Sequence, residues 1–297
     1  MQRERHIRSG RLLEVDFYPV WQNGKRAPAR APKTKPTKEE QKKYNQKQAV
    51  QNFVRMINAN YDTGDLLVHV TYSPENAPVS YVEAKKQIYN YIRRLKNRRA
   101  AEQKKIAALL ASAPGDKALL AKKKKLSEDF RYYTVTETNT YKSGRYKGRS
   151  SWHFHIFMTG GLERDTVEDV WELGARVNAD RYQPERFGPE AAARYCAKDP
   201  CGRKRFCCSQ NHKKPIKPKP RDGKITARGV ERIATERVDD RKYWENKYRG
   251  YKFVRCIARY NEYNASWYVS VVMYKSTSDG DVPLPPWTES GRDELLW

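Results

Sequence analysis

Two alternating apolar runs, separated by a short polar segment, constrain the fold of this chain more than any other feature. The runs cover residues 132–138 (YYTVTET) and 151–158 (SWHFHIFM), and the segment between them is rich in Gly, Ser and Lys. This pattern is typical of a β-hairpin. With the turn centred near Arg145, Glu137 lies directly opposite His153. The sequence therefore predicts an antiparallel sheet built around this hairpin.

The second strand of the hairpin carries two histidines, His153 and His155, on either side of Phe154. Because side chains alternate between the faces of a strand, both imidazoles share one face and the phenylalanine lies on the other. Two imidazoles on one side are typical of a divalent-metal site, although paired histidines also occur on half-exposed strands. Glu137 is a candidate third ligand. His69, on the strand expected at residues 66–72, competes for that role, and the sequence leaves both open.

A candidate nucleophile follows in AAARYCAK, residues 191–198. Tyr195 and Lys198 are three residues apart and share one face of the helix expected at 189–198. A phenol is a poor nucleophile at neutral pH because its pKa is about 10, but a nearby ammonium group and a metal at the phosphate would make it competent. The chain has 20 tyrosines, so the Tyr-x-x-Lys spacing alone is weak. The hypothesis depends on the order Glu, His-Phe-His, Tyr-x-x-Lys.

The net charge favours a polyanionic partner, with nucleic acid as the leading candidate. The chain has 60 Lys or Arg and 35 Asp or Glu, a formal net charge of +25. Residues 131–200 contribute only 11 basic and 10 acidic side chains, so the excess lies elsewhere. We expect phosphate contacts from the basic segment 201–224, for which solvated charge is the alternative. Its candidate DNA-binding residues are Arg203, Lys204, Arg205, Lys213, Lys214 and Lys217.

No apolar run approaches the roughly 20 residues that a membrane span needs, and no signal-peptide pattern opens the chain. We therefore expect a cytoplasmic protein without a membrane partner, whose five cysteines are reduced thiols. Four cysteines and one histidine lie close together in the sequence, but their spacing is irregular for a structural zinc site. We therefore expect ordinary reduced thiols there, and we expect Cys196 to pack in the core and not to take part in catalysis. The cluster comprises Cys196, Cys201, Cys207, Cys208 and His212.

Local patterns together predict an α+β fold with a central antiparallel sheet that carries the His-x-His strand, flanking helices, a basic N-terminal arm and a C-terminal helix and β-hairpin extension. The expected parts are residues 1–60, residues 61–200 with a Lys-rich helical insertion at about 98–128, and residues 201–297. Further elements are a strand at 11–21, an extended arm at 23–36, and helices at 37–60, 163–175 and 226–248. The C-terminal hairpin spans 253–259 and 266–275. Its aromatic residues suit either base stacking or a core: Tyr260, Tyr263, Trp267 and Tyr268.

Three motifs resemble those of the HUH endonucleases, in which two histidines flank a hydrophobic residue. They are LLVHVTYS (66–73), WHFHIFM (152–158) and RYCAK (194–198). The order of these motifs along the chain, with the tyrosine after the histidines, is similar to that of single-tyrosine rolling-circle replication initiators. The longer stretch from GGLERDTVEDVWELG to NHKKP resembles replication-associated proteins of mobile elements in Gram-positive bacteria. The resemblance covers roughly residues 10–275, and residues 130–215 are its specific part.

The resemblance implies an HUH-like fold in which His153, His155 and Glu137 ligate Mg²⁺ or Mn²⁺. Tyr195 would attack a DNA phosphodiester to give a 5′-phosphotyrosine and a free 3′-OH, and Lys198 would position it and offset charge. The implied partners are single-stranded or hairpin origin DNA and a host polymerase. A host helicase is expected because the chain has no P-loop. The alternatives are a single-tyrosine transposase and a non-catalytic basic nucleic-acid-binding protein.

Overall fold

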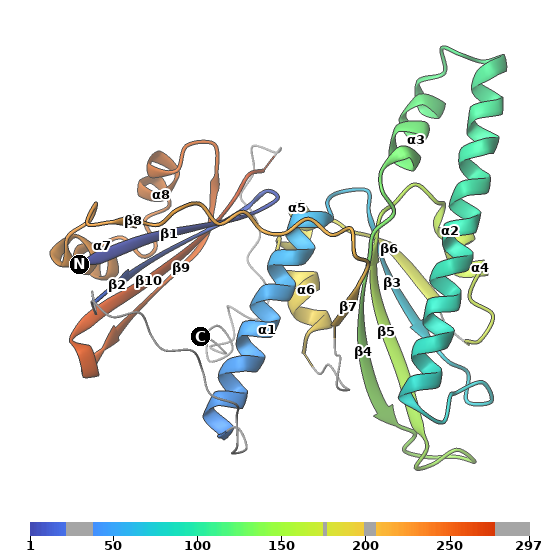
Figure 1. The fold of residues 1–297 in the computed structure, drawn as a ribbon, viewed down its shortest axis with the longest axis horizontal. Coiled ribbons are helices and arrows are strands. Elements are labelled where there is room, and N and C mark those ends of the chain that lie inside the picture. The colour runs from blue at the N-terminus through green and yellow to red at the C-terminus, as the bar shows by residue number, and fades with distance from the viewer. Residues whose placement is uncertain (22–37, 175–176, 199–205, 277–297) are drawn as a thin grey trace. The chain divides into compact units, whose positions relative to one another are not determined.

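The computed structural model describes residues 1–21, 38–174, 177–198 and 206–276 (Figure 1). The fold is α+β, with two five-stranded antiparallel sheets and several helices. The chain forms two compact units, which we call unit 1 and unit 2. Unit 1 comprises Met1–Ala59, Pro184–Ala192 and Lys213–Trp297, and unit 2 comprises Asn60–Gln183 and Ala193–His212. The predicted arm at 23–36 lies outside the described residues.

The sheet of unit 1 joins the two ends of the chain. Its strand order is β8-β1-β2-β10-β9. The N-terminal strands β1 (Gln2–Ser9) and β2 (Leu12–Pro19) form one hairpin, and β9 (Lys252–Asn261) and β10 (Ser266–Tyr274) form another. The two hairpins meet where β10 pairs antiparallel with β2, and β8 (Arg221–Asp222) borders β1. The first and last parts of the sequence thus contribute to one sheet.

Helices lie on the sheet of unit 1. One hydrophobic core contains Val15 and Phe17 of β2 together with side chains of α7 (Ala227–Glu236) and α8 (Arg241–Lys247). From α1 (Glu39–Asn60), the Arg55 guanidinium donates to both carboxylate oxygens of Glu14, at 2.7 and 3.0 Å. Glu14 alternates with Val15 along β2, so α1 contacts the opposite face from α7 and α8. The short α5 (Pro184–Phe187) also belongs to this unit.

The sheet of unit 2 has the order β6-β3-β5-β4-β7. The predicted hairpin forms its centre as β4 (Tyr132–Thr140) and β5 (Ser150–Met158), and Glu137 pairs with His153 as the sequence predicts. The strand β3 (Leu66–Thr71) pairs with β5 on the other side. The edge strands are β6 (Val177–Arg181) and β7 (Phe206–Cys208).

The core of unit 2 lies between one face of this sheet and α2 (Tyr81–Ser112). Alternate residues of the central strands, such as Val70, Phe154 and Ile156, are buried together with Ile88 and Leu95 of the helix. Figure 1 shows α2 running along this sheet and continuing beyond it, where it pairs with α3 (Lys117–Ser127). The second half of α2 and all of α3 form the predicted Lys-rich helical insertion at about 98–128, and the two helices make a helical hairpin. The opposite face of the sheet carries the predicted metal ligands, which are described below.

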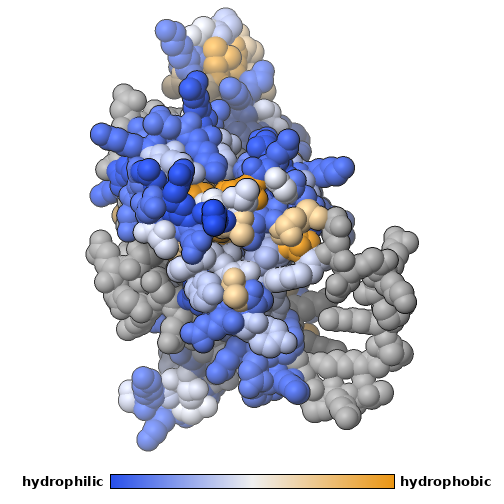
Figure 2. All heavy atoms as spheres, turned by 90° about the vertical axis from the view of Figure 1, so that its left-hand side faces the viewer, coloured by the Kyte–Doolittle hydropathy of each residue, from blue (hydrophilic) through white to orange (hydrophobic). Residues whose placement is uncertain are grey.

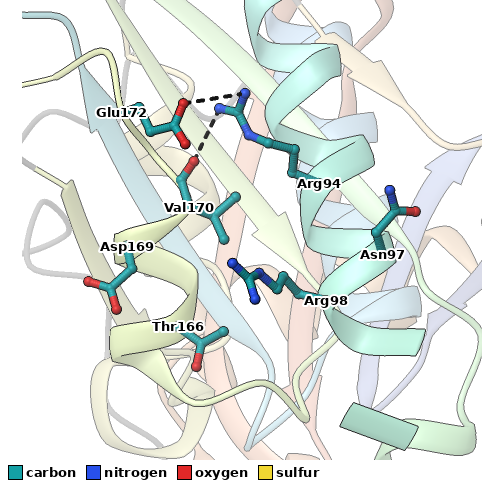
Figure 3. Close-up of a pocket in the computed structure, with 7 residues that line it drawn as sticks. All are labelled: Arg94, Asn97, Arg98, Thr166, Asp169, Val170 and Glu172. Carbon is teal, nitrogen blue, oxygen red and sulfur yellow. Dashed lines mark hydrogen bonds and ion pairs between the residues drawn. The ribbon is translucent and has the colours of Figure 1, made fainter. Parts of the chain in front are cut away.

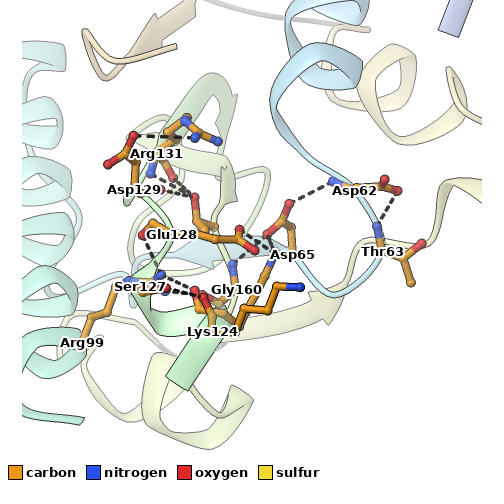
Figure 4. Close-up of polar contacts among 12 residues, drawn as sticks. Asp62, Thr63, Asp65, Arg99, Lys124, Ser127, Glu128, Asp129, Arg131 and Gly160 are labelled. Carbon is orange, nitrogen blue, oxygen red and sulfur yellow. Dashed lines mark hydrogen bonds and ion pairs between the residues drawn. The ribbon is translucent and has the colours of Figure 1, made fainter. Parts of the chain in front are cut away.

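A polar cluster anchors the base of this helical hairpin (Figure 4). The buried Arg99 guanidinium donates to three carbonyl oxygens, those of Gly160, Lys125 and Glu128, the last two at 2.7 and 3.0 Å. The buried Asp65 carboxylate accepts from the Gly160 N–H and pairs with the Lys125 ammonium, both at 2.9 Å. These contacts join the start of β3, the end of β5 and the end of α3.

Replacing Arg99 with Met is expected to lower the free energy of unfolding by about 2–3 kcal/mol, because three carbonyls lose a charged donor at once. The exposed neighbour Arg98 provides the control, and Arg98→Met should change stability by less than about 0.5 kcal/mol. Denaturant unfolding followed by circular dichroism measures both. Equal stability of the two variants would contradict the anchoring role.

Several predicted elements differ in extent. The helix predicted at 163–175 is only α4 (Arg164–Asp169), and the stretch 189–198 contains only the one-turn α6 (Ala191–Cys196). The basic segment 201–224, for which no regular element was predicted, includes the short strands β7 and β8. The stretch 226–248, predicted as helical in one or two pieces, forms two helices, α7 and α8, as expected. A short 3₁₀ turn, η1 (Glu262–Asn264), joins β9 to β10. Within the described ranges no helix is both long and apolar enough to cross a membrane. The side shown in Figure 2 is largely hydrophilic, with small hydrophobic areas.

Candidate metal and nucleophile site

The face of the unit 2 sheet opposite α2 collects the predicted ligands. In the register of the strands, His69 pairs with His155, and Glu137 pairs with His153. Directly paired residues of antiparallel strands point to the same face, and so do residues two apart on one strand. His69, Glu137, His153 and His155 therefore lie on one face of three adjacent strands.

His155 is the centre of this group. Its Nδ1 lies 2.7 Å from the Nδ1 of His69, so one imidazole donates a hydrogen bond to the other. The two rings meet edge to face, with 4.6 Å between their centres. On the other side, its Nε2 lies 3.2 Å from a carboxylate oxygen of Glu137. The Nε2 of His153 instead contacts the Ser151 hydroxyl at 3.3 Å.

The Nε2 of His155 is buried and finds no hydrogen-bond partner among the residues that the structure describes, because the nearby Glu137 oxygen is not aligned for a hydrogen bond. A nitrogen and an oxygen that bind one divalent ion at about 2.1 Å in adjacent octahedral positions lie about 3.0 Å apart. The observed 3.2 Å therefore suits two ligands of one ion. The donor types also fit, but no three His, Cys, Asp or Glu side chains converge on one point among the described residues.

Burial favours the neutral form of two of these histidines, His69 and His153. Burial, and then the neighbouring His155, lowers the pKa of His69 to about 4. Burial also lowers the pKa of His153 below its usual range. With a pKa of about 4, His69 is uncharged at neutral pH, and the neutral imidazole is the form that ligates metals.

Tyr195 lies beside this group. Its neighbours Ala193, Cys196 and Ala197 are buried, whereas Tyr195 is 61% exposed. The Tyr195 ring meets the His155 ring edge to face at 6.0 Å. The structure therefore brings together the predicted nucleophile and the predicted histidine strand.

Lys198 lies in the turn after α6, where its backbone N–H donates to the Tyr195 carbonyl at 3.2 Å. The helix ends at Cys196, so the prediction that the helix continues to Lys198 is wrong. The Lys198 side chain is exposed to solvent.

The remaining predicted residues fall elsewhere. Lys213, Lys214 and Lys217 are exposed and belong to unit 1. Arg203, Lys204, Arg205 and Cys201 lie outside the described residues. The sequence treated His69 as an alternative ligand, and its contact with the other nitrogen of His155 is a role that only the register reveals.

The cysteine cluster does not form a zinc site among the described residues. Cys196 is buried, as predicted, and burial raises the pKa of its thiol. His212 is engaged by oxygen atoms instead, with its Nε2 at 2.8 Å from the Tyr61 hydroxyl and its Nδ1 at 3.0 Å from the Ser209 carbonyl. Cys207 and Cys208 are adjacent on β7 and therefore point to opposite faces.

A cavity of about 440 Å³ lies away from this group, between α2 and the α4 region (Figure 3). The Arg94 guanidinium donates to the Val170 carbonyl at 3.1 Å and lies 3.9 Å from the Glu172 carboxylate. Acidic and basic side chains line the cavity together, so it offers no excess charge to a phosphate. It borders α2, which covers the other face of the sheet.

Comparison with known proteins adds no relative. No protein-family model, curated protein or solved structure matches this chain. The resemblance to HUH endonucleases therefore stays a prediction from the sequence motifs.

Proposed function

We propose that unit 2 is a metal-dependent HUH-type endonuclease that nicks single-stranded DNA at a specific site and starts rolling-circle replication. One observation carries the proposal. Tyr195 contacts His155 on the sheet face that also bears His69, His153 and Glu137. An exposed phenol beside imidazole and carboxylate groups is the arrangement that covalent phosphoryl transfer requires.

The proposed step forms one bond and breaks one. The Tyr195 oxygen bonds to the phosphorus of a phosphodiester, and the bond from phosphorus to the 3′ oxygen breaks. The phenol loses one proton and the leaving 3′ oxygen gains one, so charge and protons balance. The products are a 5′-phosphotyrosine and a free 3′-OH. Because the phosphodiester is exchanged and not hydrolysed, the same site can rejoin the ends.

The chain's own residues orient this reaction. His69 fixes His155 through the Nδ1 contact and leaves the Nε2 of His155 facing Glu137. A divalent ion such as Mg²⁺ or Mn²⁺, held by His153, His155 and Glu137, would polarise the phosphate and offset its developing charge. Lys198 adds a positive charge on the tyrosine side.

The layout of charge supports a DNA substrate. Residues 131–200 are nearly neutral, so most of the net charge of +25 lies outside the segment that carries His153, His155 and Tyr195. Exposed lysines such as Lys213, Lys214 and Lys217 are placed to contact phosphates in a salt-dependent way. We propose that the protein acts in the cytoplasm on origin DNA, where a host helicase unwinds the duplex and a host polymerase extends the 3′-OH.

The polarity of the covalent adduct tests this function. The full chain is incubated with Mn²⁺ and a pool of degenerate single-stranded DNA that is labelled at either the 3′ or the 5′ end. A 5′-phosphotyrosine retains the 3′ label on the protein in a denaturing gel and releases the 5′ label, and EDTA prevents both. Retention of the 5′ label, or no adduct at any Mn²⁺ concentration, would contradict the proposal.

Replacing His69 and Glu137 separately with Ala tests which of the two is the third metal ligand. We expect His69→Ala to weaken Mn²⁺ binding about 10-fold, as for a group that only orients a ligand. Glu137→Ala should weaken it further, because a ligand itself is lost. Titration of Mn²⁺ followed by electron paramagnetic resonance measures both affinities. The reverse order would assign the ligand role to His69.

A further inference from the structure

A second group of aromatic and basic side chains lies in unit 1, on the sheet face opposite α7 and α8. Arg5 pairs with Asp16 across β1 and β2, and Asp16 pairs with Ser270 of β10. Tyr18 lies two residues from Asp16, and Tyr268 two residues from Ser270, so both share this face. Phe17, which alternates with them, packs in the core with Trp244.

The same face continues onto β9. Tyr268 pairs with Arg259, which therefore points to the same side. Arg5, Tyr18, Tyr268 and Arg259 thus follow one another across four adjacent strands, in the order β1, β2, β10 and β9.

Two hollows meet at Tyr268. One, of about 230 Å³, includes Arg5 and Tyr18 in its lining, and the other, of about 420 Å³, includes Arg259 and Tyr263. Tyr268 lines both, so the two hollows are neighbours on this part of the sheet, one towards β1 and the other at the turn between β9 and β10. We call the two hollows together the tyrosine groove.

The turn between β9 and β10 presents an aromatic ring to solvent. Tyr263 is 99% exposed. Its N–H donates to the Asn261 side chain at 3.0 Å, and the Asn264 amide donates to the Tyr268 hydroxyl at 2.8 Å. Ala265 closes the turn with φ at +46°, in the left-handed region that a non-glycine residue rarely adopts. The turn backbone is thus fixed by these contacts, and the Tyr263 ring that it carries is accessible to a partner.

The chemistry of the groove fits unpaired nucleobases. Aromatic faces stack on any base, and guanidinium groups add cation–π and phosphate contacts. The Arg5 guanidinium already lies 5.4 Å from the centre of the Tyr18 ring. Charged and amide groups are interleaved with the rings, including Asp16, Asn261 and Glu262. Such a lining suits a polar, flat ligand better than an apolar protein surface.

We propose that the tyrosine groove binds single-stranded DNA, with unpaired bases stacked on Tyr263 and Tyr268. This site is distinct from the metal and nucleophile site of unit 2, and it requires neither a metal ion nor cleavage. It gives the chain a means of holding an unpaired strand.

Binding without cleavage tests the proposal. Fluorescence anisotropy measures the affinity of the full chain for a fluorescein-labelled 20-nucleotide oligo-dT in EDTA at fixed salt. We expect Tyr263→Leu and Tyr268→Leu each to weaken binding about 5- to 100-fold, whereas Tyr263→Phe stays within about 2-fold of wild type. Tyr44, a 56% exposed tyrosine of α1, provides the control, and Tyr44→Leu should leave the affinity unchanged.

Two further measurements separate stacking from charge and from misfolding. An abasic oligonucleotide of the same length should bind the wild type and Tyr263→Leu equally, because it has phosphates but no bases. On the wild-type chain, photocrosslinking with 5-iodouracil should label peptides that contain Tyr263 or Tyr268. Equal oligo-dT affinity of Tyr263→Leu and wild type, an equal loss with the abasic strand, or crosslinks found only outside the groove would overturn the proposal.

Discussion

Replacing Tyr195 with Phe is expected to reduce the covalent protein–DNA adduct by at least about 10³-fold, since the ring remains and only the attacking oxygen is lost. The ring is 61% exposed, so the hydroxyl makes little contribution to the core and the fold should be unchanged. The edge-to-face contact with His155 also survives the change. The loss would therefore report on the chemical step. A gel with 3′-labelled DNA in Mn²⁺ measures it.

Tyr44 gives a matched control for this substitution, because it is an exposed tyrosine of unit 1. Tyr44→Phe should form the adduct at the wild-type rate. Binding of oligo-dT in EDTA should be the same for Tyr195→Phe and wild type, because the proposed stacking site lies in the tyrosine groove. Adduct formation by Tyr195→Phe at the wild-type level would rule out Tyr195 as the nucleophile.

Replacing Glu190 with Ala is expected to lower the free energy of unfolding by about 3–5 kcal/mol, because it leaves a buried charge without its partner. The Arg255 guanidinium of β9 donates to both Glu190 oxygens, at 2.9 and 3.1 Å, and Glu190 is fully buried. The pair, with the bond from the Asn58 amide to the Pro189 carbonyl, fixes the segment Pro184–Ala192 within unit 1.

The exposed pair of Glu39 and Lys42 on α1 is the control for this prediction. Glu39→Ala should change stability by less than about 1 kcal/mol, since exposed ion pairs contribute little. The double variant Glu190→Leu with Arg255→Leu should recover part of the loss, because no unpaired charge remains. Urea unfolding followed by circular dichroism compares the variants. A change of less than 1 kcal/mol for Glu190→Ala would contradict the role of the pair.

Sequence patterns predicted the centre of unit 2 well, because its signals are local. Alternation over β4 and β5, with a turn near Arg145, was enough to pair Glu137 with His153. The same alternation placed His153 and His155 on one face, opposite Phe154 in the core. These relations depend only on residues that are close in the sequence of one hairpin, so they can be predicted from the sequence alone.

Pairings between distant segments could not be predicted in this way. The strand β1 was missed because its inward residues include the buried polar side chains Gln2, Glu4 and His6, which give no apolar period. The Glu4 carboxylate accepts from the Tyr248 hydroxyl and pairs with His6, which satisfies it in the core. The edge strand β6 (VNADR) was also missed, because it is short and its residues are mostly polar. The joining of both chain ends in one sheet has no local signature.

The helix that carries Tyr195, α6, shows the limit of spacing arguments. A separation of three residues placed Tyr195 and Lys198 on one helical face, but α6 is only one turn and ends before the lysine. The contact between Tyr195 and His155 depends on where α6 lies in unit 2. That position could not be predicted from the periodicity of the sequence.

Mass spectrometry of the adduct tests the central claim most directly. The full chain is reacted with degenerate single-stranded DNA in Mn²⁺, the adduct is digested with nuclease and protease, and the peptide that carries the residual nucleotide is sequenced. We predict a nucleotide linked through its 5′ phosphate to the Tyr195 oxygen. A nucleotide attached to any other residue, with the Tyr195 peptide unmodified, would contradict the assignment of the site.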